Sequence, residues 1–590
     1  MRWGEAISVS GPSRLAGRLG AVKNGWNRRV LFVLASVPLA AVLVLLAVTL
    51  WVSLLDDPNA GLKSGLSLRH FVALYGDPFV ASALLNTLGF AATAVSVAMV
   101  LGVAAAWLVE STDLPLKRLA YLLMTIGLLV PTFFQAMGWV FFLHPRIGML
   151  NRWLMALFGL DSAPINIANV VGMGWVEGLG LASLAFIMTS PILRMLNPAL
   201  EEAALVHGLG RWWTLGHVVA PLLQPALLAA AIYIGVIALA TFDVPAVIGL
   251  GNKIFTFSTL IYVRVTPETG LPDYGVVGAL SAALVVVSLF LSCWYFRVIR
   301  LAHRYQVVEG RNYRPMRTSL GGKRWLAWVG LGGYFILAQG MPLLMVIWAA
   351  LLPYFQPLSI AALSHVTLKN FASVDWSLLL RGAINTLTLM VTVPTFAVLF
   401  GLAISWVVVR SRARVRFAFD LVAFLPHAIP NLVFALALVV FALFVVPRGV
   451  PFYGTVGIIA AAYVLVRISL TTRVFNGALL QIHRELEDVA YICGMRTLQT
   501  LWKVILPLLV PAILNLWVWC ALLSYRELTM AAFMVSQHNL TVPVIIWGFW
   551  NTGHSGQAAA ASLIFMAALA PFIALYWGLR SRANLESLDA

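Results

Sequence analysis

Long uninterrupted runs of apolar residues are the feature of this sequence that most restricts its fold. Several runs exceed the roughly 18 residues that allow a helix to cross the hydrocarbon core of a membrane. Hydrophobic residues make up 61% of the 590 residues and charged residues only 10%, far below the roughly 25% charged residues of soluble domains. No stretch is polar enough to form a soluble domain. The sequence therefore predicts an all-α, polytopic membrane protein.

About 12 membrane-spanning segments can be placed on these apolar runs. We expect them near residues 30–55, 84–109, 119–142, 171–193, 222–247, 274–296, 325–352, 387–409, 417–446, 455–480, 508–537 and 558–579. The first run is too long for the core of a signal peptide. We therefore interpret it as a retained first helix.

Residues of the first half recur in the second half at one constant offset. The matching pairs are Asn86 and Asn385, Thr87 and Thr386, Leu88 and Leu387, Gly102 and Gly401, Ala104 and Ala403, Trp107 and Trp406, and Pro131 and Pro430. So many matches at one spacing indicate two six-span units. Both units begin on the same side, so we expect a parallel repeat about an axis along the membrane normal. The predicted division is a tail 1–29, a first unit 30–303, a linker 304–323, a second unit 324–581 and a tail 582–590.

The net charge of +17 follows the predicted topology. If the amino terminus lies in the cytoplasm, 29 of the 39 Lys and Arg fall on the cytoplasmic side or in the inner parts of spans. Basic residues are retained on that side during insertion. We therefore expect both termini in the cytoplasm, and the basic charge gives no reason to expect nucleic-acid binding.

Two polar segments between long apolar runs, 202–221 and 488–507, share one pattern. In each, an acidic residue stands six positions before a glycine and a proline stands thirteen positions after it. The patterned residues are Glu202, Ala203, Ala204, Gly208 and Pro221, and Asp488, Val489, Ala490, Gly494 and Pro507. Glycine lets a backbone turn tightly because it lacks a Cβ, so we expect each glycine to separate two short helices. Proline is tolerated in the first turn of a helix, which suits the start of the fifth and eleventh spans.

These two segments resemble the EAA loop of the membrane subunits of ATP-binding-cassette importers, the loop that docks on the ATPase. The stretch TFDVPAVIGLGN from Thr241, the stretch YREL from Tyr525 and the layout of six plus six spans look like fused permeases of the iron(III)- and thiamine-type group. The resemblance covers most of the chain. The second loop departs from the pattern, since Asp488 replaces Glu and Val489 replaces the first Ala.

The resemblance implies a type I importer permease in a bacterial inner membrane, with membrane lipid around it. Two copies of a cytoplasmic ATPase subunit would bind the two loops, and the short helices 203–209 and 489–495 would transmit their closure. A periplasmic solute-binding protein would deliver the solute from the other side. The resemblance favours iron(III) as the solute, while thiamine, polyamines and organophosphonates stay open.

The sequence contains no motif for an ATP-binding site. No GxxxxGK[ST] phosphate loop occurs in it, so we expect ATP and magnesium on a partner subunit and no cofactor in this chain. Cys293, Cys493 and Cys520 give no disulfide framework or metal motif. We predict a transport subunit, not an enzyme, with no catalytic and no metal-binding residues.

Candidates for a solute pathway are harder to assign. Asp243 and Glu527 lie about 20 residues into the span after each loop, or roughly 30 Å along a helix. Together with Arg526 and Glu177, they form a polar vestibule in one interpretation. In the other interpretation they lie at the water interface and only pair helices.

Two further polar residues have two interpretations each. Arg467 lies roughly 20 Å into the tenth span, where it either lines the path or snorkels beside Arg473; we favour snorkelling. His427, between Pro426 and Pro430, either faces a cavity as a gate or packs through a hydrogen bond; we include it with the pathway candidates and favour packing.

Two other function classes compete with the importer permease. An ion- or proton-coupled secondary transporter also commonly has two six-helix halves, but it predicts coupling carboxylates or histidines near the midplane and gives no reason for two EAA-like loops. A membrane-embedded enzyme would need a cluster of His, Asp or Glu, which the sequence lacks.

Overall fold

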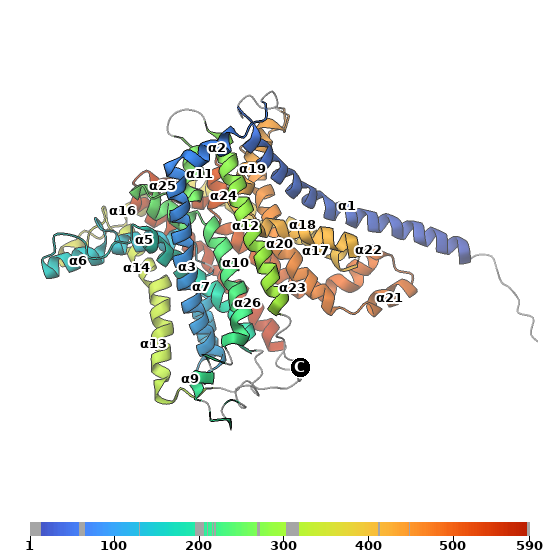
Figure 1. Cartoon of the computed structure of the whole chain (residues 1–590), viewed down its shortest axis with the longest axis horizontal. Helices are drawn as coiled ribbons and strands as arrows, with labels where there is room; N and C mark the ends of the chain where they lie inside the picture. Colours follow the sequence, from blue (N-terminus) through green and yellow to red (C-terminus); the bar gives the residue numbers. More distant parts are fainter. Residues whose placement is uncertain are drawn as a thin grey trace, which may run out of the picture.

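The chain folds into a bundle of long helices, seen in a computed structural model (Figure 1). The structure describes every residue except 1–12, 58–64, 129, 195–203, 205, 209, 215, 218–219, 268–271, 303–317, 411–412, 448 and 587–590. Among the residues described, ten helices are long and apolar enough to cross a membrane, or up to twelve if each of two bent pairs is one span. This part of the chain has two isolated bridges and no strand. The predicted all-α, polytopic fold is confirmed.

The helices of the first half are α1 (Ser13–Leu54), α2 (Arg69–Gly76), α3 (Pro78–Glu110), α4 (Lys117–Ile126), α5 (Thr132–Leu143), α6 (Met149–Phe158), α7 (Val170–Arg194), α9 (Arg211–Thr214), α10 (Ala220–Ala240), α11 (Phe257–Val265) and α12 (Tyr274–Ala302). Those of the second half are α13 (Arg324–Phe335), α14 (Met341–Ala350), α15 (Ile360–Leu363), α16 (Lys369–Ala372), α17 (Trp376–Arg410), α18 (Ala413–Ala428), α19 (Asn431–Phe444), α20 (Val456–Gln481), α21 (Glu485–Ile492), α22 (Thr497–Thr500), α23 (Leu506–Tyr525), α24 (Thr529–Phe533), α25 (Val542–Asn551) and α26 (Ser555–Glu586). The helix α1 begins inside the segment predicted as a tail.

The third and ninth predicted spans are broken at equivalent prolines. Pro131 and Pro430 both have extended backbone angles and directly precede α5 and α19. The two parts of the ninth span, α18 and α19, meet at 102°. Proline lacks an N–H and disfavours helical angles in the residue before it, which explains why both spans break there.

The fifth and eleventh spans end earlier than predicted. The helix α10 ends at Ala240, not at residue 247, and α23 ends at Tyr525, not at residue 537. After α10 the chain forms a second broken unit, in which the helical segment Pro245–Asn252 and α11 meet at 72°. The second half has α24 and α25 in the same place in the chain order. Apart from Asp243, Arg526 and Glu527, the residues that follow Ala240 and Tyr525 are mostly apolar, so hydropathy extended the prediction past each break.

The repeated Asn-Thr pairs hold these short helices in the same way in both units. Asn86 and Asn385 each donate from Nδ2 at 2.9 Å, to the carbonyl oxygens of Phe255 and Leu540. The Oγ1 atoms of the neighbouring threonines accept hydrogen bonds from the backbone N–H groups of Phe257 (2.8 Å) and Val542 (3.1 Å). Both contacts satisfy backbone groups at the start of α11 and α25, which have no helical partner. The repeat seen in the sequence is therefore a structural repeat.

The repeated glycines allow two helix pairs to touch. A Cβ on Gly102 would lie 2.5 Å from the Cβ of Ala185 and 2.7 Å from the carbonyl oxygen of Ala182. Gly401 faces Thr471 in the equivalent place between α17 and α20. We expect Gly102→Leu to destabilise the protein by about 3 kcal/mol or more, because the obstructing atoms include backbone. Gly330→Leu, at a position where a Cβ would meet no atom within 4 Å, is the control. Thermal unfolding in detergent measures both, and equal midpoints would contradict the close approach.

The first span of each unit packs against the other unit. The helix α1 contacts α17, α18 and α19, and Figure 1 shows it extending from near α2 and α19 past α18. In the other direction, α13 and α14 contact α4 and α5. The hydroxyl of Tyr334 lies 3.0 Å from that of Ser183 and donates to the carbonyl oxygen of Leu179 at 3.1 Å. The two sequence units therefore interlock instead of lying side by side.

The end of the linker is tied to the first unit. Most of the predicted linker 304–323 lies outside the described residues, but Thr318 pairs with Thr112. Arg324 lies 2.6 Å from Asp113, whose other carboxylate oxygen accepts from the N–H of Leu320 at 2.8 Å. The hydrogen bond from Arg324 and that from the Leu320 N–H lower the pKa of Asp113 to about 2.

The lowered pKa of Asp113 predicts how its ion pair with Arg324 responds to acid. A carboxyl group whose pKa falls on folding stabilises the fold above its unfolded value of 3.8 and loses that effect as the pH falls through about 2. We expect the infrared carboxylate band of Asp113, found by subtracting the spectrum of Asp113→Asn, to titrate near pH 2. A midpoint near the unfolded value of 3.8 would contradict the ion pair.

Candidate functional site

Equivalent segments of the two units meet directly after α10 and α23. Thr241–Asp243 and Glu527–Thr529 are separated by 286 residues, the same separation as Gly208 and Gly494. Across them, Thr529 Oγ1 donates to Asp243 Oδ1 at 3.0 Å. Asp243 and Thr529 are thus equivalent positions in contact with each other. Equivalent positions can touch only near the axis that relates the two units, so this contact marks the axis.

Other side chains of the first unit complete the surroundings of Asp243. Thr132, the first residue of α5, donates from Oγ1 to Asp243 Oδ2 at 2.9 Å. Thr241 donates from Oγ1 to Glu177 Oε1 at 3.1 Å. Glu177 is only 2% exposed, and its Oε2 has no hydrogen-bond partner among the described residues. The first unit therefore presents two carboxyl groups beside the axis.

Arg526 reaches from the second unit to the first. Its Nη1 donates to the carbonyl oxygen of Leu128 and lies 3.5 Å from that of Val130. Both carbonyl groups are at the break between α4 and α5. In a membrane, backbone groups freed by a broken helix need a partner inside the protein, and the guanidinium supplies one.

Arg467 contradicts the prediction that it snorkels beside Arg473. Its guanidinium lies 3.2 Å from the carboxylate of Glu527, and both side chains are 12% exposed. Arg473 instead lies 3.8 Å from Asp420. Charged groups at membrane depth normally pair or face an aqueous path, and the nearby carboxylate makes pairing possible for Arg467. We call Glu177, Asp243, Arg467, Arg526 and Glu527 the axis cluster.

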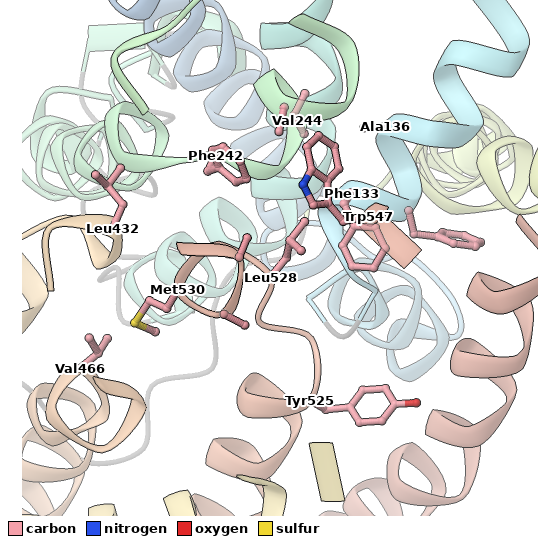
Figure 2. Close-up of a cluster of buried hydrophobic side chains, with 14 of the residues drawn as sticks. Phe133, Ala136, Phe242, Val244, Leu432, Val466, Tyr525, Leu528, Met530 and Trp547 are labelled. Carbon is pink, nitrogen blue, oxygen red and sulfur yellow. The ribbon is translucent and has the colours of Figure 1, made fainter. Parts of the chain in front are cut away.

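An apolar layer lies beside the axis cluster and also joins the two units. The ring of Phe242 packs edge-to-face on Phe533 and Trp547, with centroids 5.7 and 6.0 Å apart. Figure 2 shows Phe133, Phe242 and Val244 of the first unit around Leu528 and Trp547 of the second. Leu528 is the equivalent of Phe242 by the same separation. Polar and apolar contacts together hold the units against each other at this level.

His427 lies in a separate aromatic contact between the units. Its ring stacks on Tyr233 with centroids 4.5 Å apart and lies 5.5 Å from the ring of Phe424. These neighbours are aromatic residues outside the axis cluster. This geometry fits packing and not a gate, but through stacked rings: no hydrogen bond of His427 is seen among the described residues, unlike the hydrogen-bonded packing that we expected.

The two EAA-like loops have the predicted glycine turns. Gly208 and Gly494 have φ of +77° and +78°, in the left-handed region that favours glycine. Gly494 lies between α21 and α22, as expected, but the helix predicted over 489–495 spans Glu485–Ile492. Glu202 and Ala203 lie outside the described residues.

The remaining loop residues divide by exposure. Ala204 and Ala490 are buried, while Asp488 and Val489 are exposed. Pro221 and Pro507 are the second residues of α10 and α23. The segment Leu501–Ile505 before α23 is also helical, and one continuous helix runs from Thr497 to Tyr525, so the prediction that Pro507 marks the start of the eleventh span is wrong.

One pair of loop residues was missed in the sequence. Val206 is 84% exposed and Ile492 is 85% exposed, and they are 286 residues apart. The same separation applied to the whole loop would have found them. Among the described residues of the two loops, Val206 and Ile492 are the most exposed apolar side chains, and they stand at equivalent positions.

No resident metal centre is seen in the part of the chain that the structure describes. There, no group of three or more His, Cys, Asp or Glu side chains is arranged to hold an ion. Within the axis cluster, the guanidinium of Arg526 interacts electrostatically with the carboxyl groups of Asp243, Glu527 and Glu177.

Comparison with known proteins identifies relatives along most of the chain. The family described as "Binding-protein-dependent transport system inner membrane component" matches twice, at residues 98–304 and 397–583. The Fe(3+)-transport system permease protein FbpB 2 of Haemophilus influenzae is 23% identical over 85% of this chain and 90% of its own length. The ferric transport system permease protein FbpB of Actinobacillus pleuropneumoniae is 23% identical over 76% of this chain, which spans 64% of that relative.

A shorter relative matches a single unit. The putative 2-aminoethylphosphonate transport system permease protein PhnU of Salmonella choleraesuis is 25% identical over 45% of this chain and 90% of its own length. A solved bacterial alginate ABC transporter aligns at 19% identity with a TM-score of 0.32, over 41% of this chain and 85% of that one, which is too low to carry an argument. The double family match and the shorter relative agree with two fused units.

Proposed function

Because the chain belongs to the family of binding-protein-dependent transport system inner membrane components, we propose that it imports iron(III) as the fused permease subunit of an ATP-driven importer. The chain is a multi-pass inner-membrane transport protein of two fused units. Iron is the solute named for two relatives that align with most of this chain. Because both relatives are only 23% identical to this chain, iron(III) as its solute is our proposal.

The single observation that carries the coupling proposal is the equivalence of the two loops. Both have a left-handed glycine and both present an exposed apolar residue two positions before it, Val206 and Ile492. A single exposed apolar side chain is ordinary on a protein surface, but its recurrence at the same position of two equivalent loops favours a protein partner that binds both loops in the same way. We infer that each loop docks one copy of a separate ATPase subunit, which holds the ATP and magnesium.

The orientation follows from this docking. The loops face the cytoplasm, together with both termini and the basic residues near Arg297 and Arg410. A periplasmic solute-binding protein delivers the solute at the opposite end of the bundle. The contacts of the axis cluster and of the apolar layer around Phe242 then close the path between the two units. ATP binding draws the two loops together, which separates the units at the axis and opens the path.

An ion-coupled secondary transporter is the second candidate. The observation that favours it is Glu177, a buried carboxyl group with one oxygen unpartnered among the described residues, as a proton- or ion-coupling site would have. That class gives no role to the exposed residues Val206 and Ile492.

Uptake into vesicles separates the two candidates. We expect the complex of this chain, a cassette ATPase and a solute-binding protein to accumulate radiolabelled iron(III) only with ATP. Dissipating ion gradients with ionophores should leave this uptake unchanged. Uptake that needs a proton or sodium gradient and no ATP would show the secondary transporter instead.

A further inference from the structure

The two units contribute opposite net charge to the axis cluster, since the first unit supplies Glu177 and Asp243 and the second supplies Arg467, Arg526 and Glu527. Among the described residues, the first unit supplies oxygen acceptors and hydroxyl groups to these contacts: the carboxyl groups of Glu177 and Asp243, the carbonyl oxygens of Leu128 and Val130, and the hydroxyl groups of Thr132 and Thr241. We call this set the oxygen wall. Its two carboxyl groups give it a formal charge of −2.

The second unit offers one cation to this wall. Arg467 is paired with Glu527 of its own unit at 3.2 Å, so their charges cancel. Arg526 instead places its Nη1 on the carbonyl groups of Leu128 and Val130, which belong to the first unit. Glu177, Asp243 and Glu527 are all within electrostatic range of it. Arg526 is therefore a cation tethered to one unit and bound by the other.

We propose that the oxygen wall is a binding site for a cationic solute, and that Arg526 occupies this site when no solute is present. The inference rests on the proposed import function. Opening of the interface withdraws Arg526 together with the second unit and leaves the wall with unbalanced negative charge. A cation that enters replaces the guanidinium, and closing of the interface expels it.

Glu177 supplies evidence for a ligand that is independent of the arginine. Its Oε2 is buried without a partner among the described residues, although burying a polar oxygen without a hydrogen-bond partner is unfavourable. Its other oxygen is held by Thr241 at 3.1 Å, so the carboxyl group is fixed in place. A bound cation would give the free oxygen a partner.

The charge of the wall excludes anions. Carboxylate and carbonyl oxygens attract metal cations and ammonium groups and repel phosphate or carboxylate solutes at membrane depth. Hard metal cations prefer oxygen ligands, and protonated amines donate hydrogen bonds to the same atoms. The shared chemistry is a cation that accepts oxygen ligands, and the two kinds of cation can be distinguished by experiment.

Binding to the full-length chain in lipid nanodiscs tests the proposal without ATP. Terbium(III), whose luminescence is sensitised by nearby tryptophan, serves as the hard metal cation, and radiolabelled spermidine serves as the amine. We expect Arg526→Gln to bind one of these probes at least about tenfold tighter than the wild type, or about 1.4 kcal/mol, because the competing guanidinium is gone. Arg526→Lys keeps the charge and should bind like the wild type.

The controls separate the site from a general effect of charge. Arg473→Gln removes another arginine, which pairs with Asp420, and should leave binding unchanged. Adding Asp243→Asn to Arg526→Gln should abolish the gain. If Arg526→Gln fails to fold, Glu177→Gln in the wild-type background tests the same wall, with about tenfold weaker binding expected.

Several outcomes would overturn the proposal. They are no gain for either probe, a gain that survives Asp243→Asn, or tighter binding of phosphate to Arg526→Gln. A gain for terbium alone assigns the site to metal cations, and a gain for spermidine alone assigns it to amines. Because the assay contains no ATPase, it can fail while ATP-driven import stands, and it can succeed while import fails.

Discussion

Replacing Val206 and Ile492 together by aspartate is expected to abolish ATP-driven uptake and to lower the recovery of the ATPase subunit at least about tenfold. These two side chains are the most exposed apolar ones among the described residues of the equivalent loops, at 84% and 85% exposure. Each charge would have to be desolvated in an apolar contact, which costs several times the roughly 1.4 kcal/mol that gives a tenfold change in affinity. Co-purification of tagged chain and ATPase measures the effect.

A matched control tests whether any exposed isoleucine would give the same result. Ile360 is 89% exposed and lies in α15, which belongs to neither loop. We expect Ile360→Asp to leave ATPase recovery and uptake at the wild-type level. Undiminished recovery in the double loop variant would show that the loops do not dock the ATPase through these residues.

Replacing Phe242 by alanine is expected to raise ATP hydrolysis about tenfold in the absence of the solute-binding protein. Phe242 is fully buried and packs across the axis on Phe533 and Trp547. Removing a buried phenylalanine costs about 3–5 kcal/mol, and here that cost falls on the closed arrangement of the two units. The arrangement with separated units then forms without the binding protein.

Phe90→Ala separates this effect from a loss of stability. Phe90 is equally buried, at 1% exposure, and lies in α3 against α7 within the first unit. We expect it to lower the unfolding temperature as Phe242→Ala does, while ATP hydrolysis still depends on the binding protein. Equal hydrolysis in the two variants would contradict the role of Phe242 in closing the interface.

Much of the fold could be predicted from the sequence because its signals are local and repeated. The apolar runs located the long helices, and the constant offset located the two units. The loops were found through the spacing of Gly208 and Gly494, whose left-handed angles need glycine. These features depend on the period of a helix or on the backbone of one residue.

The axis cluster could be predicted only in part. Asp243, Arg526, Glu527 and Glu177 were selected because ionisable residues are rare in spans. The partners stayed hidden, because Arg526 binds a carbonyl group 398 residues away and Thr529 binds Asp243 across 286 residues. Arg467 was assigned to snorkelling for the same reason, since Glu527, 60 residues further on, is near it only in the folded chain.

The ends of the fifth and eleventh spans were the other feature that could not be predicted well from the sequence. The mostly apolar segments 241–247 and 528–537 look like continuations of the preceding helices, but α10 and α23 end at Ala240 and Tyr525 and the chain forms short helices instead. The repeated Asn residues of the two units carried information on where these spans end. Asn86 and Asn385 are placed to bind the segments that follow these breaks, which is a contact that no hydropathy pattern contains.

The central claim is that this chain moves solute only when a separate ATPase acts on its two loops. Uptake into sealed vesicles with an imposed iron(III) gradient tests this claim most directly. Vesicles with the chain alone should not accumulate radiolabelled iron, and vesicles that also contain the ATPase, the binding protein and ATP should. Accumulation against a gradient by the chain alone, without nucleotide or companion subunit, would contradict the account.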